Sequence, residues 1–113
     1  METIQDYIQS VRILLQDQME PYRYSDDEMV LALNLAFSEA YRLRPDMFVL
    51  SPVLPNYLGK PMATKVMVPT GYQSAFMYYI AGHIQLRDGE ETQDSRAGVF
   101  LTKFTSQLLT TAA

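Results

Sequence analysis

Hydrophobic residues recur every three or four positions in the first part of the chain. Over residues 3–18 the apolar positions are Ile4, Tyr7, Ile8, Val11, Leu14 and Leu15, and the polar positions between them include Gln5, Gln9, Arg12 and Gln16. This spacing predicts an amphipathic helix over residues 3–18. Thr3 and Asp6 form a capping pair at its start, and Pro21 prevents simple continuation beyond its end.

A second helix is indicated by the sequence Ser25-Asp26-Asp27-Glu28. A serine followed three residues later by glutamate is a capping box, and acidic residues complement the positive end of a helix. The run that follows carries a broad apolar stripe of Met29, Ala32, Leu33, Ala36, Phe37, Ala40 and Tyr41. Pro45 disfavours helical geometry at Arg44, so we expect the helix to end there.

Residues 45–68 change character, because five of the six prolines lie in this stretch or at its end: Pro45, Pro52, Pro55, Pro61 and Pro69. Such a density of proline excludes a long helix. Two short apolar runs, at 48–50 and 65–68, could pair as an antiparallel β-ribbon. The alternative is an irregular segment that caps one end of the helices.

Helical periodicity returns after Pro69. A third helix is predicted from about residue 70 to 86, with Ala81 and Gly82 small enough to let another helix approach. After the turn signal Asp88-Gly89, a fourth helix is predicted from about residue 90 to 109, with Ala97, Phe100, Leu101, Phe104 and Leu108 on its buried face. The predicted fold is therefore mainly α. It is one domain over residues 1–113, bundle-like with four helices, and has an irregular or β-ribbon insertion at about 45–68 between helices 2 and 3.

Composition narrows the classes of function. The chain has 113 residues, of which 48% are hydrophobic and 19% charged, a net charge of −4 and no cysteine. These values fit a small globular domain and disfavour a general nucleic-acid binder, and the missing cysteine excludes disulfides and thiolate chemistry. Neither a membrane-spanning segment nor a secretory signal is expected, which indicates a protein that begins in the cytoplasm.

No residue pattern points to catalysis. His83 is the only histidine, and no carboxylate lies three or four residues before it on the same helical face. A core or helix-end histidine is the better interpretation. The acidic stretch at 88–94 lacks the residue order of a calcium loop, and the five glycines form no phosphate-binding loop. We therefore expect no enzymatic activity, no metal and no cofactor.

Three segments form a pattern when they are taken together: the run from Arg23 to Phe48, the run from Tyr72 to Phe104 and the proline-rich segment between them. Their most specific parts are Arg42-Leu43-Arg44-Pro45-Asp46 and the stretch from Gly82-His83 to Arg96-Ala97. This pattern resembles the small adaptor, or head–tail connector, proteins of tailed bacteriophages. The resemblance covers most of the chain.

The resemblance implies a structural role in the neck of the virion, with host cytoplasm as the location before assembly. Such adaptors form a ring, usually twelvefold, beneath the portal protein. The ring extends the DNA channel, through which DNA passes without specific binding, and docks the tail nozzle or tail-tube proteins. Two alternatives from other classes are a generic helical protein–protein interaction subunit and a non-catalytic subunit of an enzyme complex.

Charged residues at two places are candidate interface residues. The first set closes the second predicted helix and the second brackets the turn before the fourth. If the helices are antiparallel, both sets could lie near one end of the bundle and form ion pairs, some of them between subunits. The set consists of Arg42, Arg44, Asp46, Arg87, Asp88, Asp94 and Arg96.

Overall fold

The computed structural model describes residues 1–19, 21–48, 53–86 and 91–109. Within these ranges the chain forms four α-helices and two short 3₁₀-helices, η1 and η2, and no β-strand. Their bounds are α1 (Ile4–Leu15), α2 (Asp26–Leu43), η1 (Pro45–Phe48), η2 (Thr70–Tyr72), α3 (Gln73–Leu86) and α4 (Glu91–Leu109). The prediction of a mainly helical fold is confirmed.

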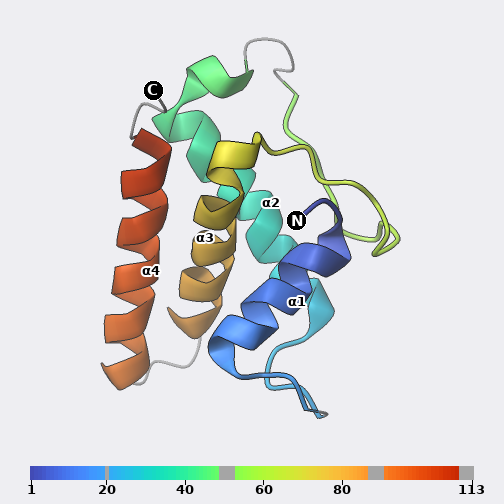
Figure 1. The fold of residues 1–113 in the computed structure, drawn as a ribbon, viewed down its shortest axis with the longest axis vertical. Coiled ribbons are helices and arrows are strands. Elements are labelled where there is room, and N and C mark those ends of the chain that lie inside the picture. The colour runs from blue at the N-terminus through green and yellow to red at the C-terminus, as the bar shows by residue number, and fades with distance from the viewer. Residues whose placement is uncertain (20, 49–52, 87–90, 110–113) are drawn as a thin grey trace.

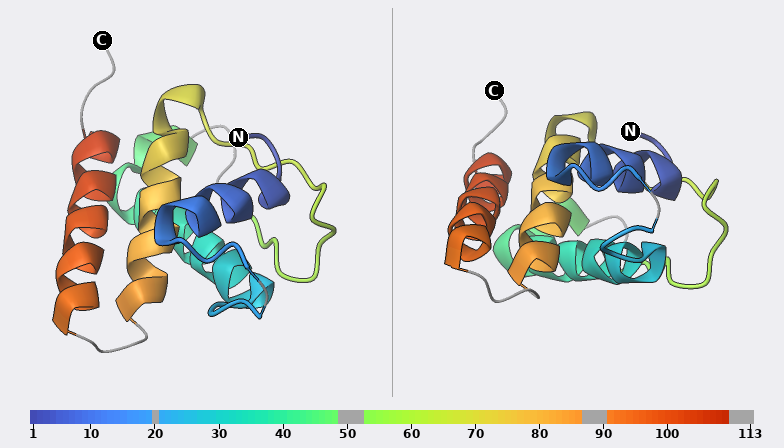
Figure 2. Two further views of the ribbon diagram at one scale, coloured as in Figure 1. Left: turned by 60° about the horizontal axis from the view of Figure 1, so that its bottom comes forward. Right: turned by 90° about the horizontal axis from the view of Figure 1, so that it is seen from below.

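Helix α3 is the central element, because its contacts with α1, α2 and α4 are the most extensive in the molecule's described part. Helix α4 runs beside α3 in the opposite direction and forms one side of the molecule (Figure 1). Seen from below, α1 and α2 form two layers beside α3, and residues 53–69 lie on the side away from α4 (Figure 2). The arrangement is thus a core of three helices, α1 to α3, with α4 packed along α3.

Both predicted N-terminal caps are present. The Asp6 amide donates to Thr3 Oγ1 at 3.2 Å while the Thr3 amide donates to Asp6 Oδ2 at 3.1 Å. The Glu28 amide donates to Ser25 Oγ at 3.2 Å and the Ser25 amide donates to Glu28 Oε2 at 3.3 Å. Each reciprocal pair satisfies amides that a helix start leaves without partners, so α1 and α2 begin where the sequence indicates.

Helix α1 ends at Leu15, three residues earlier than predicted. Gln16 adopts the left-handed conformation with φ 58° and ψ 40°, which stops the helix. The chain then turns inward, so that Asp17 is buried and accepts hydrogen bonds from the Arg23 and Tyr24 amides at 2.8 and 3.2 Å. The boundary was wrong because a tertiary contact of Asp17, rather than Pro21, fixes it.

Arg12 is buried between α1 and α2, although the sequence pattern placed it among the polar positions of the helix. It donates from Nη1 to Asp17 Oδ2 at 2.8 Å and from Nη2 to Asp26 Oδ1 at 2.7 Å. The ring of Tyr22 lies over its guanidinium, 3.9 Å from the ring centroid to Cζ. Arg12 therefore ties the end of α1, the connecting loop and the start of α2 together.

The described part of the insertion is irregular rather than a β-ribbon. Lys65 forms an isolated antiparallel bridge with Thr3, flanked by hydrogen bonds from the Val66 amide to the Glu2 carbonyl at 2.7 Å and from the Ile4 amide to the Thr64 carbonyl at 3.0 Å. The run at 65–68 thus pairs with the N-terminal residues. Of the run at 48–50, residues 49 and 50 lie outside the described residues.

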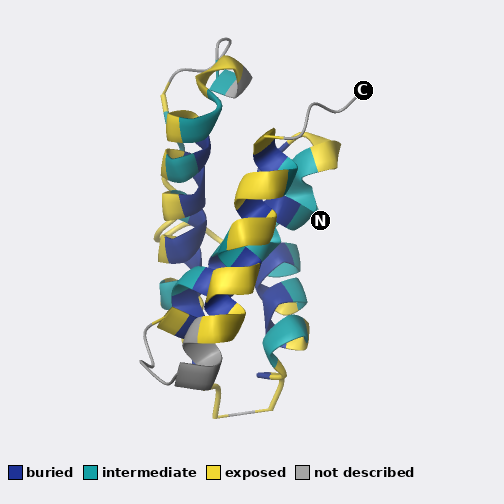
Figure 3. Ribbon diagram, turned by 90° about the vertical axis from the view of Figure 1, so that its left-hand side faces the viewer, coloured by how far each residue is buried: buried dark blue, intermediate teal, exposed yellow. Residues whose placement is uncertain are grey.

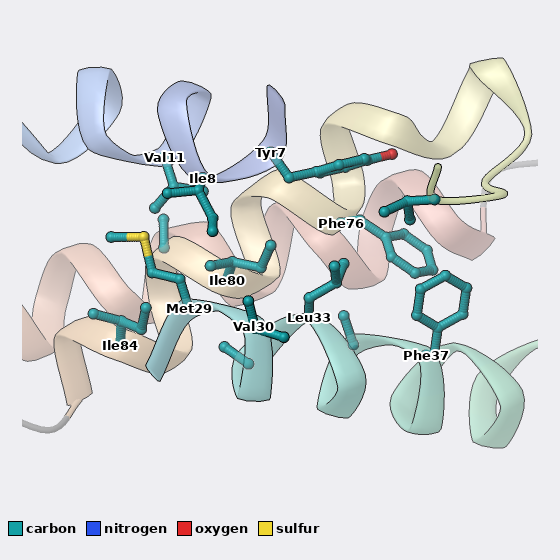
Figure 4. Packing of buried hydrophobic residues seen from close by; sticks show 14 of the residues in the cluster. Tyr7, Ile8, Val11, Met29, Val30, Leu33, Phe37, Phe76, Ile80 and Ile84 are labelled. Carbon is teal, nitrogen blue, oxygen red and sulfur yellow. The ribbon is translucent and has the colours of Figure 1, made fainter. Parts of the chain in front are cut away.

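The core lies where α1, α2 and α3 meet (Figure 4). Leu33 of α2 and Phe76 of α3 are each 1% exposed, as their positions at the centre of apolar stripes predict. Tyr7 of α1 is fully buried, and burial raises the pKa of its phenol. Four positions depart from the predicted stripes: Tyr41 is exposed, and Leu14, Leu15 and Leu101 are only half-buried.

Gly82 sets the spacing between α3 and α4, as its small size predicts. A Cβ added there would lie 2.9 Å from Leu101 Cγ and 3.0 Å from the Ala97 carbonyl oxygen. Gly82→Ala is therefore expected to lower the free energy of unfolding by about 1–3 kcal/mol, despite the better helix propensity of alanine. Urea denaturation of the purified variant measures this change.

Gly98→Ala is the matched control for this prediction. Gly98 lies on the exposed side of α4, where an added Cβ meets nothing within 4 Å. The same substitution there should raise stability by up to about 1 kcal/mol. If the two variants proved equally stable, α3 and α4 would have to pack farther apart than the structure shows.

Candidate interaction surfaces

Arg44 connects the end of α2 to the end of α4. Its Nε and Nη2 donate to the two carboxylate oxygens of Asp46 at 3.0 and 2.9 Å. Its Nη1 donates to the Leu108 carbonyl at 2.7 Å and to the Tyr72 hydroxyl at 3.4 Å. The last carbonyls of a helix have no partner within it, so this contact caps α4. An arginine fork thus holds a carboxylate in two-point contact within one subunit.

The ion pair shifts the titration of Asp46. The hydrogen bonds from Arg44 hold the pKa of the Asp46 carboxyl below its ordinary value of 3.8. Hydrogen bonding to Asp46 and to Tyr72 in turn raises the pKa of Arg44. Because the folded-state pKa of Asp46 is depressed, its contribution to stability is present above the unfolded pKa and is lost as pH falls through the folded pKa.

We therefore expect Asp46→Asn to destabilise the chain near neutral pH and to matter less in acid. The difference between the urea midpoints of the native chain and the variant should become smaller as the pH falls from about 7 to about 3, because below the unfolded pKa of about 3.9 protonation of Asp46 competes with its pairing to the charged fork. Midpoints measured by circular dichroism at both pH values give the comparison. A difference that is the same at both would show that the ion pair contributes nothing to folding.

Arg42 pairs within its own helix. Its Nη2 lies 2.8 Å from Glu39 Oε2, three residues earlier, and its side chain is 67% exposed. Hydrogen bonds to Glu39 raise the pKa of Arg42. An exposed pair of this kind contributes about 0–1 kcal/mol, so Arg42 is available to a partner at little cost to the fold.

Arg44 and Arg96, one from each predicted charged set, lie near opposite ends of α4, so these two residues do not meet within one subunit. Arg44 contacts the last turn of α4, whereas Arg96 lies in its first turns, where its guanidinium is 5.7 Å from the Phe100 ring centroid. Twelve residues of helix separate Leu108 from Arg96, about 18 Å at the usual rise. Arg87 and Asp88 lie outside the described residues, as does the side chain of Asp94. Sequence spacing could not reveal which end of α4 the end of α2 reaches.

A groove of about 300 Å³ runs between α2, α3 and α4. The groove brings together Glu39 of α2 with Tyr79 and His83, which lie in successive turns of α3. His83 lies in the last turn of α3, half-buried, and stacks on Tyr79 with 5.8 Å between ring centroids. Burial, with Glu39 nearby, raises the pKa of the Tyr79 phenol. The sequence showed only the spacing of four residues between Tyr79 and His83, and had no signal for Glu39.

Large apolar side chains remain in contact with water on several elements. On α2, Leu31 and Leu35 are 50% and 36% exposed, and on α4, Val99 and Leu109 are 55% and 51% exposed. Figure 3 shows the exposed side of α4 as a nearly continuous band. Residues Gly98, Val99, Thr102, Thr105, Ser106 and Leu109 on this side are all uncharged and exposed. Exposed apolar residues grouped on helix faces are typical of protein–protein contact surfaces.

The described residues contain neither a metal site nor a helix that could cross a membrane. Among them, no group of three or more His, Asp or Glu side chains is placed to hold a metal ion. None of their helices has the length and apolar character that a membrane crossing requires.

Comparisons with known proteins give no relative for this chain. No family model matches it, and neither the comparison with curated proteins nor the one with solved structures finds a match. The likeness to phage adaptors therefore rests on residues 23–48 and 72–104 and the proline-rich segment between them.

Proposed function

We propose that this chain is a structural head–tail adaptor of a tailed bacteriophage. In this proposal it forms a ring beneath the portal that extends the DNA channel and docks the tail. The resemblance of residues 23–48 and 72–104 to such adaptors supports the proposal, and the mainly helical fold is compatible with it. We propose neither an enzymatic activity nor a cofactor for this chain.

The observation that carries the proposal is the exposure of large apolar side chains on two unlike helix faces. Leu31 and Leu35 lie on α2, and Val99 and Leu109 on α4, which forms a different side of the molecule. A ring contact is heterologous: it joins one surface of a subunit to a different surface of the next. Two separate apolar faces on one small domain satisfy this requirement. Removing these faces from water would stabilise the contact between subunits.

In this proposal the ring contacts other virion proteins on both of its sides. The portal protein lies above the ring and the tail nozzle or tail-tube proteins lie below it, in the neck of the virion, with the host cytoplasm as the location before assembly. The net charge of −4 would disfavour retention of DNA in the channel, since phosphates are repelled. Arg42, which pairs with Glu39 on the surface, is available for contacts between subunits.

The experiment is to mix the purified chain with the portal protein of the same genome and weigh the product by native mass spectrometry. We expect one ring of this chain on each portal ring. The variants Leu31→Glu with Leu35→Glu, and Val99→Glu with Leu109→Glu, should remain folded monomers and lose the ring, because each places two charges in the proposed contact.

Gln9→Glu is the control, since it adds a charge at an exposed position of α1. This variant should assemble as the native chain does. If the native chain does not bind the portal, the adaptor assignment is wrong. Stable association with a different protein, or restored activity of an enzyme complex on adding the chain, would favour one of the two alternative functions.

A further inference from the structure

The insertion, α2 and α3 together enclose an apolar pocket of about 240 Å³ that lies apart from the exposed faces of α2 and α4. Phe37 of α2, Phe76 of α3 and Tyr57 of the insertion line it and are each less than 10% exposed. None of the described residues that line it is charged. The pocket therefore offers a preformed apolar surface rather than a site for an ion.

Aromatic rings make up much of the wall. The Phe37 ring centroid is 4.9 Å from that of Phe76 at an interplanar angle of 70°, and 6.4 Å from that of Phe48 at 69°. It lies 5.8 Å from the ring centroid of Tyr57. Figure 4 shows Phe37 and Phe76 reaching toward each other from α2 and α3. Rings in edge-to-face contact hold one another in place and favour a further ring in the same kind of contact.

The volume fits one aromatic side chain. An apolar cavity of about 150 Å³ is large enough to bind benzene. A pocket of about 240 Å³ has room for a ring as large as phenol or indole, but not for two such side chains. Binding energy at protein interfaces is concentrated in aromatic residues that fill pockets of this kind.

The residues at the rim of the pocket indicate that the aromatic group bound there belongs to a protein rather than to a free small molecule. Val53 and Met67 line the pocket, yet their side chains are 81% and 79% exposed. A small molecule inside the pocket would leave both in water, whereas the residues beside an anchoring aromatic side chain would cover them. Methionine is also the side chain that adapts most readily to a partner surface.

We propose that this pocket receives a single aromatic side chain from an uncharged segment of a partner protein, with Val53 and Met67 packed against the flanking residues of that segment. This proposal is independent of the adaptor assignment, because it rests only on the pocket and its rim. It also differs from the ring contact, which uses the exposed faces of α2 and α4.

The first test uses indole as a probe of the pocket in the full chain. With ¹³C-labelled methionine methyl groups, we expect a saturable change in the Met67 resonance during the titration. Met19 is 84% exposed and does not line the pocket, so its methyl resonance is the internal control and should not move. A Met67 resonance that stays unchanged up to the solubility limit of indole, or that moves only in parallel with Met19, overturns the proposal.

The second test selects a random peptide library on the native chain. We expect selected peptides to share an aromatic residue with uncharged neighbours, and indole to compete with them. Val53→Asp and Met67→Asp should each weaken binding of a selected peptide by about tenfold or more, since a charge at the rim opposes burial. Both residues are exposed, so the variants should keep the native circular dichroism spectrum.

Leu58→Asp is the matched control for the rim variants. Leu58 belongs to the same insertion and is 47% exposed, but it does not line the pocket, so this variant should bind the peptide as the native chain does. Equal binding by all three variants overturns the proposal. A Met67 resonance that shifts with protein concentration alone would identify a second copy of this chain as the occupant, and would also overturn it.

Discussion

Replacing Arg12 with methionine is expected to lower the free energy of unfolding by about 3–5 kcal/mol, the cost of removing one partner from a buried ion pair. The Arg12 and Asp17 side chains are 6% and 8% exposed, and their charged atoms lie 2.8 Å apart. Methionine fills much of the same volume but leaves Asp17 as a buried carboxylate without a cation beside it among the described residues, although the Arg23 and Tyr24 amides still donate to it. Urea denaturation followed by circular dichroism measures the change.

Arg42→Met provides the comparison, because Arg42 also pairs with a carboxylate but is exposed. That variant should lose no more than about 1 kcal/mol. A second variant, Arg12→Met with Asp17→Asn, should recover part of the lost stability, since no charge is then buried without a partner. If Arg12→Met cost as little as Arg42→Met, the contact would have to be solvated.

The second large effect is expected from truncating the core. Leu33→Ala should lower the free energy of unfolding by about 2–5 kcal/mol and Phe76→Ala by about 3–5 kcal/mol, because each removes a side chain that is 1% exposed and leaves a cavity. Phe76 is also in edge-to-face contact with Phe37 and Phe104, at 4.9 and 6.1 Å between ring centroids. Denaturant midpoints of both variants provide the measurement.

Leu31→Ala is the control on the same helix as Leu33, since Leu31 is 50% exposed and faces water. Its loss should be well below that of Leu33→Ala. Midpoints that do not change for either Leu33→Ala or Phe76→Ala would place these stripes against solvent or a partner rather than in the core. They would then contradict the arrangement of α1, α2 and α3.

Features that depend on neighbouring residues were predictable from sequence. The capping boxes at Thr3 and Ser25 act within one helical turn, and the apolar stripes around Leu33 and Phe76 report which side of each helix is buried. Gly82 was also recognisable as a place of close approach, because only a small residue would leave room there. The starts of α1 and α2 follow from such local signals, whereas α3 begins at Gln73, after a 3₁₀ turn at the predicted start.

Features set by contacts between distant segments were not predictable. Arg12 occupies a polar position in the pattern, and only the path of residues 16–26 brings two carboxylates to it. The apolar run at 65–68 has the composition of a strand, but nothing in its own sequence shows that the N-terminal residues provide its pairing. Arg44 was singled out as charged, yet its contact with Leu108 depends on where α4 ends in space.

The pairing of Thr3 with Lys65 has a consequence for synthesis on the ribosome. Residue 3 emerges first, while its partner at residue 65, and α3 beyond it, are still to be made. At about 5–20 residues per second, the apolar side of α1 waits roughly 3–12 s before the pairing can form. During that time Ile4, Tyr7 and Ile8, all buried in the finished fold, are exposed to chaperones and proteases. Nascent chains arrested before residue 65 should therefore be cleaved within α1, and full-length released chains should not.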